Sequence, residues 1–550
     1  MKYNYIIVAI FCSLGILSST RAQDSLKKKN IEITSSFKPV LRESSKIRLN
    51  ASQLPTMVNS VQLQYDVPRN HFTPAYTIAG VTSVDLKKEL TYPWPASHFI
   101  KIGAGNFHLP FIELGSSGNK DTSFRYHVYA KQFHSKGNIA FQKDAITDFN
   151  AGLSYKDRHS KEWNAALSMT DQRRLLYGFQ PDTLKMTEDL LQQNFFGFES
   201  SVDFRNTNPT DFGITYHPSL RFGLFSGKQQ MKAQETNMVM ELPVDKSLGS
   251  LLSFHFSAKA DITQYSKKTV PSLEIQNTLY SLNPVFLVKS PNVFLHAGIL
   301  PTWDQKIFNM LPDVMGEFST NDQRFTLQLG WLGYFNKGSF KNFAAENPFL
   351  AQPDSLKNTR VREVYGGLKG TLGNYFSYSS KVSFIKYRNA VLFANDTLDG
   401  KTFLPLYEPG MEMLKLHGTL NYSVGERFSA DVSVTYQQVT SLLEQQKAWG
   451  LIPLELKGGM KWLVFKDLWL TSQLWVWDGP QYRTKKLDHL RNEGGVDLNA
   501  GVDFRISKNF NAWIQCNNIF NSNYQRWNQY QTYGFNFLGG FTYHFPGKGR

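Results

Sequence analysis

Most of the chain after about residue 98 alternates between apolar and polar positions. The segment VDLNAGVDFRI (496–506) places six apolar residues on one face and polar residues or glycine on the other. The segments LKLHGTLNYSV (414–424) and RFSADVSVTY (427–436) repeat this pattern, and only a few residues separate them. Because side chains alternate across a β-strand, the pattern predicts a long series of antiparallel strands joined by short turns.

The length of these segments separates two kinds of β-protein. Soluble strands average about five or six residues, whereas a strand that crosses a bilayer needs about nine to eleven. The alternation here continues for nine to fifteen residues at a time, with no helical pattern between segments. A series of soluble sandwich or propeller sheets remains the alternative. We expect an all-β protein, a transmembrane antiparallel β-barrel, with a short extended N-terminal segment.

Aromatic residues support the membrane interpretation. They make up 14% of the chain, and several gather near strand ends: Trp462, Trp469, Trp475, Trp477 and Tyr482. Aromatic girdles at both interfaces are typical of outer-membrane barrels. At roughly 25 residues per strand and turn, the chain would form about 18 strands, with 14 to 22 allowed and even numbers favoured.

Four longer segments break the alternation. They are 178–194, 338–358, 395–410 and 478–495, and they contrast with the short turns elsewhere. Such barrels have short periplasmic turns and longer extracellular loops. We therefore expect these four segments to be loops on the outer side.

The N-terminus has the features of an export signal. Lys2 precedes an apolar run from Ile6 to Leu17, and Thr20 and Ala22 suit a cleavage before residue 23. The predicted organisation is a signal peptide at 1–22, an extended periplasmic or lumen-associated segment at 23–96, a barrel at 97–545 and a short tail at 546–550. This predicts the outer membrane of a Gram-negative-type bacterium.

The formal net charge of +15 does not indicate a nucleic-acid-binding protein, because the basic residues are interleaved with acids and aromatics. Attraction to anionic lipid headgroups or to an anionic solute is a more natural use of the excess. After removal of the signal peptide only Cys516 remains, so no intrachain disulfide can form. We expect a structural role for this thiol.

The sequence contains no recognisable catalytic motif. H-E-x-x-H, G-x-S-x-G, Walker A and C-x-x-C patterns are all absent, so no enzyme, cofactor or catalytic residue is predicted. His98, His108, His127 and His134 come nearest to a metal cluster, but they fit strand surfaces better. A barrel enzyme of lipase or protease type is the weakest of the functional hypotheses.

Charged residues on the polar face of the strands are candidates for lining a solute path. These lumen candidates are Lys415, Asp431, Asp497, Asp503 and Arg505. The alternative is a lumen network that satisfies polar groups and stiffens the barrel.

The chain closes on FNFLGGFTYHF (535–545), in which one face is almost wholly aromatic. Phe535, Phe537, Phe541, Tyr543 and Phe545 are expected to face lipid. Together with the preceding N-x-F-N-x-x-Y turn (518–524), this region resembles the end of TonB-dependent outer-membrane receptors. The resemblance implies a barrel whose last strand pairs with the first and is recognised by the barrel-assembly machinery.

The chain differs from that family at its N-terminus. The receptors carry a folded plug of well over a hundred residues before the barrel, and the segment before residue 97 is too short for a recognisable plug. The leading hypothesis is a receptor-like or porin-like barrel that binds or passes an unidentified solute. The alternative is a structural or assembly partner that anchors other envelope proteins.

Overall fold

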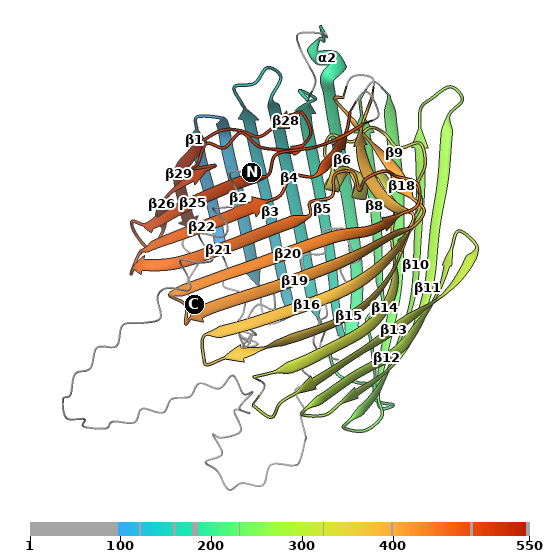
Figure 1. Cartoon of the computed structure of the whole chain (residues 1–550). Coiled ribbons are helices and arrows are strands. Elements are labelled where there is room, and N and C mark those ends of the chain that lie inside the picture. Colours follow the sequence, from blue (N-terminus) through green and yellow to red (C-terminus); the bar gives the residue numbers. More distant parts are fainter. Residues whose placement is uncertain are drawn as a thin grey trace, which may run out of the picture. The chain divides into compact units, whose positions relative to one another are not determined.

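The computed structural model describes residues 97–545, except 120–122, 158–160, 179–184, 230, 323, 398–399 and 485–487. The strands of this part of the chain form one closed antiparallel barrel (Figure 1). Each strand pairs with its neighbours along the chain, and β1 pairs with β29 to close the ring. The predicted signal peptide, the 23–96 segment and the tail lie outside the described residues.

The first eleven strand positions of the barrel are β1 (Ser97–Gly105), β2 (His108–Asn119), β3 (Phe124–Lys136), β4 (Lys143–Lys156), β5 (Lys161–Leu175), β6 (Gln192–Asn206), β8 (Ser219–Lys228), β9 (Lys232–Ser247), β10 (Leu252–Lys267), β11 (Leu273–Lys289) and β12 (Val293–Asp304). The remaining positions are β13 (Ile307–Ser319), β14 (Thr326–Asn336), β15 (Thr359–Leu372), β16 (Phe376–Arg388), β19 (Met411–Val424), β20 (Phe428–Leu442), β21 (Leu454–Phe465), β22 (Leu468–Trp477), β25 (Gly495–Arg505), β26 (Phe510–Asn517) and β29 (Asn536–Phe545). The short strand β7 (Ile214–Tyr216) pairs with β9 beyond the start of β8, so it shares a position with β8.

The barrel confirms the predicted fold class and corrects the strand number. The described chain fills 22 strand positions, whereas about 18 were expected. The observed number is the upper limit of the predicted range of 14 to 22. The error came from the turns. Connections such as 305–306 and 466–467 have two residues, so 449 residues divided by 22 gives about 20 per strand and turn rather than roughly 25.

The two faces of the wall differ as the alternation predicts. On β29, Phe537, Phe541, Tyr543 and Phe545 are exposed on the outer face, whereas Leu538 and Thr542 are buried on the inner face. Phe535 is also exposed but precedes the strand, which begins one residue later. Exposed large apolar side chains cover the outer face of the other strands in the same way. The wall therefore presents an apolar belt outward and polar groups inward.

The two ends of the barrel differ in the length of their connections. One end, here the short-turn end, has connections of two to six residues except at 207–218, and it holds residues 97 and 545. The opposite end, the long-loop end, carries the segments 176–191, 337–358, 389–410, 443–453, 478–494 and 518–535. All four predicted outer loops lie at this end, and the segments 443–453 and 518–535 join them.

The described chain has two short helices, both in segments of the long-loop end. They are α2 (Glu188–Leu191) and α3 (Phe340–Glu346). Neither of these described helices is long and apolar enough to cross a membrane. Ser339 begins α3 by accepting a hydrogen bond from the Asn342 backbone at 3.1 Å, and Phe340, Phe343 and Ala344 form its buried face.

The largest hydrophobic core lies at the long-loop end, inside the ring of strands. Phe340 of α3 is fully buried and packs against Phe195, Phe225 and Tyr265, whose side chains point inward from β6, β8 and β10. Gly227 on β8 permits this contact, because a Cβ there would stand 2.5 Å from the Phe340 ring. The segment 337–358 thus leaves β14 and packs against the inner face of β6 to β10.

Two more segments pack onto this core. Phe403 of segment 389–410 exchanges backbone hydrogen bonds with segment 337–358, and Tyr530 of segment 518–535 stacks on Phe349 with ring centroids 3.4 Å apart. Trp527 contacts Phe403 at 5.2 Å. We refer to 337–358, 389–410 and 518–535 together as the cap.

Candidate functional site: a polar cleft in the cap

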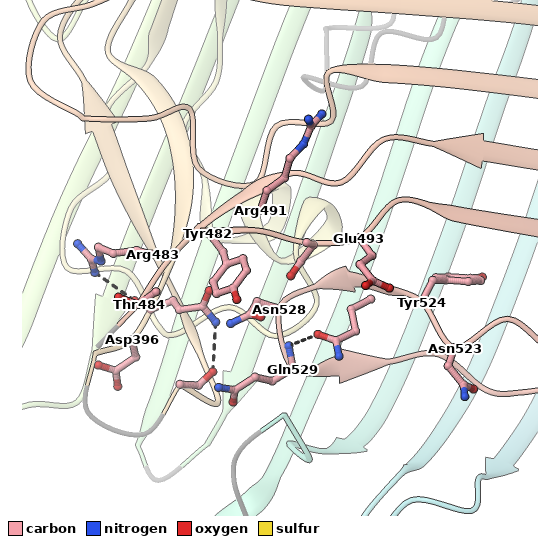
Figure 2. A pocket seen from close by; sticks show the side chains of 14 residues that line it. Asp396, Tyr482, Arg483, Thr484, Arg491, Glu493, Asn523, Tyr524, Asn528 and Gln529 are labelled. Carbon is pink, nitrogen blue, oxygen red and sulfur yellow. Dashed lines mark hydrogen bonds between the residues drawn. The ribbon is translucent and has the colours of Figure 1, made fainter. Parts of the chain in front are cut away.

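A cleft of about 520 Å³ opens among the loops of the long-loop end (Figure 2). Three small hairpins build it: β17 (Ala390–Asn395) with β18 (Phe403–Glu408), β23 (Gln481–Arg483) with β24 (His489–Arg491), and β27 (Gln525–Trp527) with β28 (Tyr530–Gln531). Backbone pairing within each hairpin fixes where its lining residues begin.

The lining is rich in amides and balanced in charge. Six amide side chains face it: Asn395, Asn492, Asn523, Gln525, Asn528 and Gln529. Two cations, Arg483 and Arg491, are matched by two carboxylates, Asp396 and Glu493. Arg491 also pairs with Asp478 outside the lining. The cleft is therefore suited to a polar solute without a large net charge.

Several polar atoms of the lining have no hydrogen-bond partner in the described protein. These buried atoms are the donors Nε of Arg483 and Nδ2 of Asn492, and the acceptors Oδ1 of Asn395 and Oε1 of Gln529. Buried polar groups are nearly always satisfied in native proteins, and an unsatisfied one costs about 1–3 kcal/mol. Water or a bound polar molecule can supply the missing partners of these four atoms.

Aromatic rings form one side of the cleft where it meets the barrel wall. Tyr524 lines the cleft and packs edge-on against Trp477 at 4.4 Å, and Trp477 stacks on Trp475 at 4.0 Å. The Tyr524 hydroxyl donates a hydrogen bond to Asp497 Oδ2 at 2.5 Å. This contact connects the cleft directly to β25 of the wall.

The segment 337–358 is fixed to the inner wall at both of its ends. The Lys337 ammonium lies 3.3 Å from Asp261 Oδ1 and donates to the Asn277 carbonyl at 2.8 Å. Asn277 and Asn358 exchange side-chain hydrogen bonds of 2.9 and 2.7 Å, and the Gly338 N–H donates to Asn358 Oδ1 at 2.9 Å. The two ends of the segment therefore lie side by side.

The middle of the same segment is held by β6, β10 and the connection between β8 and β9. Gln193 and Gln229 donate to the Leu350 carbonyl at 3.1 and 2.8 Å, and Tyr265 donates to the Pro353 carbonyl at 2.9 Å. On β9, the buried Glu235 accepts the Phe340 N–H at 2.5 Å, which places a carboxylate at the start of α3. A negative charge at that position is favourable for a helix.

Two carboxylates within the loops have opposite electrostatic environments. Desolvation raises the pKa of Glu346, at the end of α3, to about 7, and the charge of Arg526 on β27 opposes this rise. Burial acts on Glu408 in the same direction, but backbone N–H groups of Gln445, Leu443, Gly410 and Glu444 outweigh it and lower the pKa of Glu408. Glu408 thus ties segment 389–410 to segment 443–453.

The five lumen candidates lie on inward-facing positions but do not form one site. Asp497 is the only one of them in contact with a lining residue of the cleft. Lys415 lies near Glu363, Lys381 and Glu455, farther along the inner wall.

The other candidates lie away from the cleft. Asp503 accepts a hydrogen bond from Asn511 at 3.2 Å, Asp431 faces Gly459 across β20 and β21, and Arg505 pairs with Asp467 in a turn of the short-turn end.

Metal binding finds no support among the described residues, which contain no group of three or more potential ligands. His98 on β1 is hydrogen-bonded to Ser116 on β2 at 2.8 Å. His134 is hydrogen-bonded to Gln132 at 3.3 Å, and both residues lie on β3. Cys516 is a partly exposed free thiol on β26.

The alternation along the strands does not identify the lining residues of the cleft. They come from three loops that are distant in sequence, and none carries a motif. One signal was available: Ser339 followed by apolar residues at Phe340, Phe343 and Ala344 fits a capped amphipathic helix. It would have predicted that segment 338–358 packs against protein.

Comparison with known proteins gives a fold and no family. No model of a known protein family matches the chain, and no curated protein sequence matches it. Among solved structures, the siderophore receptor PirA from Acinetobacter baumannii is similar with a TM-score of 0.64 and 10% identity, over 82% of this chain and 81% of that one. A mutant of the ferric enterobactin receptor PfeA from Pseudomonas aeruginosa has a TM-score of 0.60 and 13% identity, over 82% and 80%.

A third similar structure is the FpvAI–pyocin S2 complex. It has a TM-score of 0.61 and 10% identity, over 82% of this chain and 70% of that chain. At such low identity these similarities show the fold alone. The chain has the barrel fold of siderophore receptors, which agrees with the resemblance found at its C-terminus.

Proposed function

We propose that this protein is an outer-membrane barrel that binds a polar solute of low net charge in the cleft and passes it inward when the cap moves. The observation that carries the proposal is the set of unmatched donors and acceptors in the cleft. The two donors and two acceptors belong to lining residues from three loops, which also include Tyr482 and Tyr524. Hydroxyl- or amide-rich molecules, such as oligosaccharides or peptides, offer the complementary groups.

The membrane location is supported by the wall. An outward apolar belt, an inward polar face and a closed ring without free strand edges are what a bilayer requires. The similarity of the barrel to siderophore receptors supports the same location, while their ligand is not carried over. Lipid and the barrel-assembly machinery are the partners that this location implies.

The cap supports a receptor rather than an open pore. Barrels of 22 strands enclose a lumen that their own side chains do not fill. Here a segment attached at β14–β15 reaches β6–β10 and packs there, and we infer that a polar solute meets this core on its way inward. Binding in the cleft would then precede passage.

Solute binding can be tested with purified full-length protein and a panel of neutral oligosaccharides and peptides, measured by calorimetry. We expect binding of at least one member, and a loss of about tenfold or more in Asn492→Ala/Asn528→Ala because each lost hydrogen bond contributes about 0.5–1.5 kcal/mol. Asn421→Ala, an amide near the short-turn end, is the control and should bind like the wild type. Equal binding by the cleft variant would contradict the proposed site.

A further inference from the structure

A group of cations lies on the outer face of the wall at the long-loop end. Arg360 and Arg362 on β15, and Lys386 and Arg388 on β16, are cross-strand partners: Arg360 pairs with Arg388 and Arg362 with Lys386. Residues of the same parity on these strands, Val364, Val382 and Phe384, are exposed on the outer face. Register therefore places Arg362 and Lys386 on the outer face, and Arg360 and Arg388 continue the same rows at the ends of their strands. We refer to the four cations as the basic patch.

Acids of the described chain neutralise the basic patch only in part. Lys386 pairs with Glu412 on β19 at 2.8 Å, and the charge of Arg388 acts on Asp304. Arg362 and Arg388 make no ion pair within the described residues, and Arg360 donates only to the amide oxygen of Asn309, at 2.9 Å. The positive charges of Arg362 and Arg388 also act on Arg360. A bound anion would relieve the repulsion among these like charges.

Large apolar side chains lie directly below the basic patch. Trp331, Val364 and Phe384 form neighbouring cross-strand pairs and are 55%, 52% and 65% exposed. Toward the short-turn end, the outer faces of β15 and β16 continue with Leu368, Leu372, Val382 and Phe376, all exposed. The outer face changes from apolar to basic between residues 364 and 362, and between 384 and 386.

This change has a defined place in a membrane. In outer-membrane barrels the apolar band is about 25 Å tall and the longer loops are extracellular. The basic patch therefore stands at the headgroup level of the outer leaflet, with the exposed rings of Trp331 and Phe384 at the level of the acyl chains. Guanidinium groups match phosphate oxygens in geometry as well as in charge.

We propose that the basic patch binds the phosphate groups of a phosphorylated lipid of the outer leaflet, whose acyl chains pack on Trp331, Val364 and Phe384. The site lies on the opposite side of the wall from the polar cleft. The inference rests on the proposed membrane location but not on solute binding, so either can fail while the other stands.

The test uses the full-length protein in mild detergent and native mass spectrometry with diphosphoryl lipid A as the probe. The same lipid without its phosphates, phosphatidylcholine and free inorganic phosphate are compared in parallel. Of these four probes, we expect only diphosphoryl lipid A to be retained tightly. The affinity for this lipid should fall about tenfold to thirtyfold in Arg362→Gln/Arg388→Gln, because each basic residue at a lipid surface contributes about 1 kcal/mol.

Matched variants separate this site from general charge. Arg427→Gln/Lys466→Gln removes two exposed cations from turns of the short-turn end and should leave lipid binding unchanged. Arg362→Lys/Arg388→Lys should fall between the wild type and the Gln variant, and heat-modified migration on gels verifies that each barrel is folded. Trp331→Ala should weaken the binding of diphosphoryl lipid A and leave solute binding in the cleft unchanged.

Three outcomes would overturn the proposal. They are equal retention of the lipid with and without phosphates, unchanged binding by Arg362→Gln/Arg388→Gln, and equally tight binding of inorganic phosphate, which would indicate a small-anion site.

Discussion

The two ends of this barrel are built from the same strands but differ in what connects those strands. At the short-turn end, connections such as 425–427 and 466–467 reverse the chain in two or three residues and add little to the wall. At the long-loop end, segments of eleven to 22 residues fold over one another, carry their own hydrophobic core and enclose a polar cleft. Local alternation in the sequence therefore defines the wall, whereas contacts between loops that are distant in sequence define the cleft.

The largest expected effect concerns the core of the cap. Phe340→Ala removes a fully buried ring that contacts Phe195, Phe225 and Tyr265, and such truncations cost about 3–5 kcal/mol. Because these contacts join the cap to the wall, backbone hydrogen exchange in 337–358 should accelerate on the order of a hundredfold or more, measured by mass spectrometry. Exchange in β19 to β22 should not change.

Its matched control is Phe384→Ala, which removes a ring that faces outward. That variant should leave exchange in 337–358 unaffected. Equal acceleration in both variants would mean that the segment is not held by the buried core.

The wall can be tested by placing a charge on each of its faces. Val502→Lys puts a cation on the outer apolar face, which should cost about 2–4 kcal/mol of folding free energy in a bilayer. Gln473→Lys puts the same group on the inner face, opposite Gly459 and Asn499, and should cost much less. Refolding into vesicles under a urea gradient measures both. Similar costs would contradict the assigned faces.

The smallest expected effect is a pH dependence of the cap. The pKa of Glu346 is raised from 4.5 to about 7, so the folded cap binds the proton more tightly than the open segment does. Its stabilising contribution is present below about pH 4.5 and is lost as the pH rises through about 7. Exchange in 337–358, corrected for the intrinsic rate, should be slower at about pH 5 than at about pH 8.

Glu346→Gln should reduce this difference, and Glu412→Gln, on the outer face, should keep it. Glu408 has the opposite sign, because its pKa is lowered and its contribution is lost when the pH falls. A wild-type cap that becomes more protected with rising pH would show that Glu346 does not control it.

The strands of the wall could be predicted from the sequence because the alternation within each strand is visible without its neighbours. The alternation in 496–506 identifies the exposed Val502 and Phe504 without any knowledge of the neighbouring strands. The strand number was less accurate, since it depends on turn lengths that alternation does not fix. Two-residue turns such as 305–306 left room for four more strands than expected.

The cleft could not be predicted in the same way. Asn395, Arg483 and Gln529 lie in three different loops, and only the packing of those loops brings them together. Phe349 and Tyr530 stack although they are far apart in the chain. Of the charged candidates chosen from strand patterns, Asp497 reached the cleft because it lies at the end of its strand, next to Tyr524.

We propose that the cap closes the long-loop end, and single-channel conductance in planar bilayers measures this closure. Because Gly338 and Asn358 are hydrogen-bonded to each other, residues 339–357 can be replaced by a short Gly-Ser linker without stretching the barrel. We predict that the wild type conducts little and that the shortened protein conducts at least about tenfold more, as expected for a barrel of this width. Equal conductance of the two folded proteins would contradict the account.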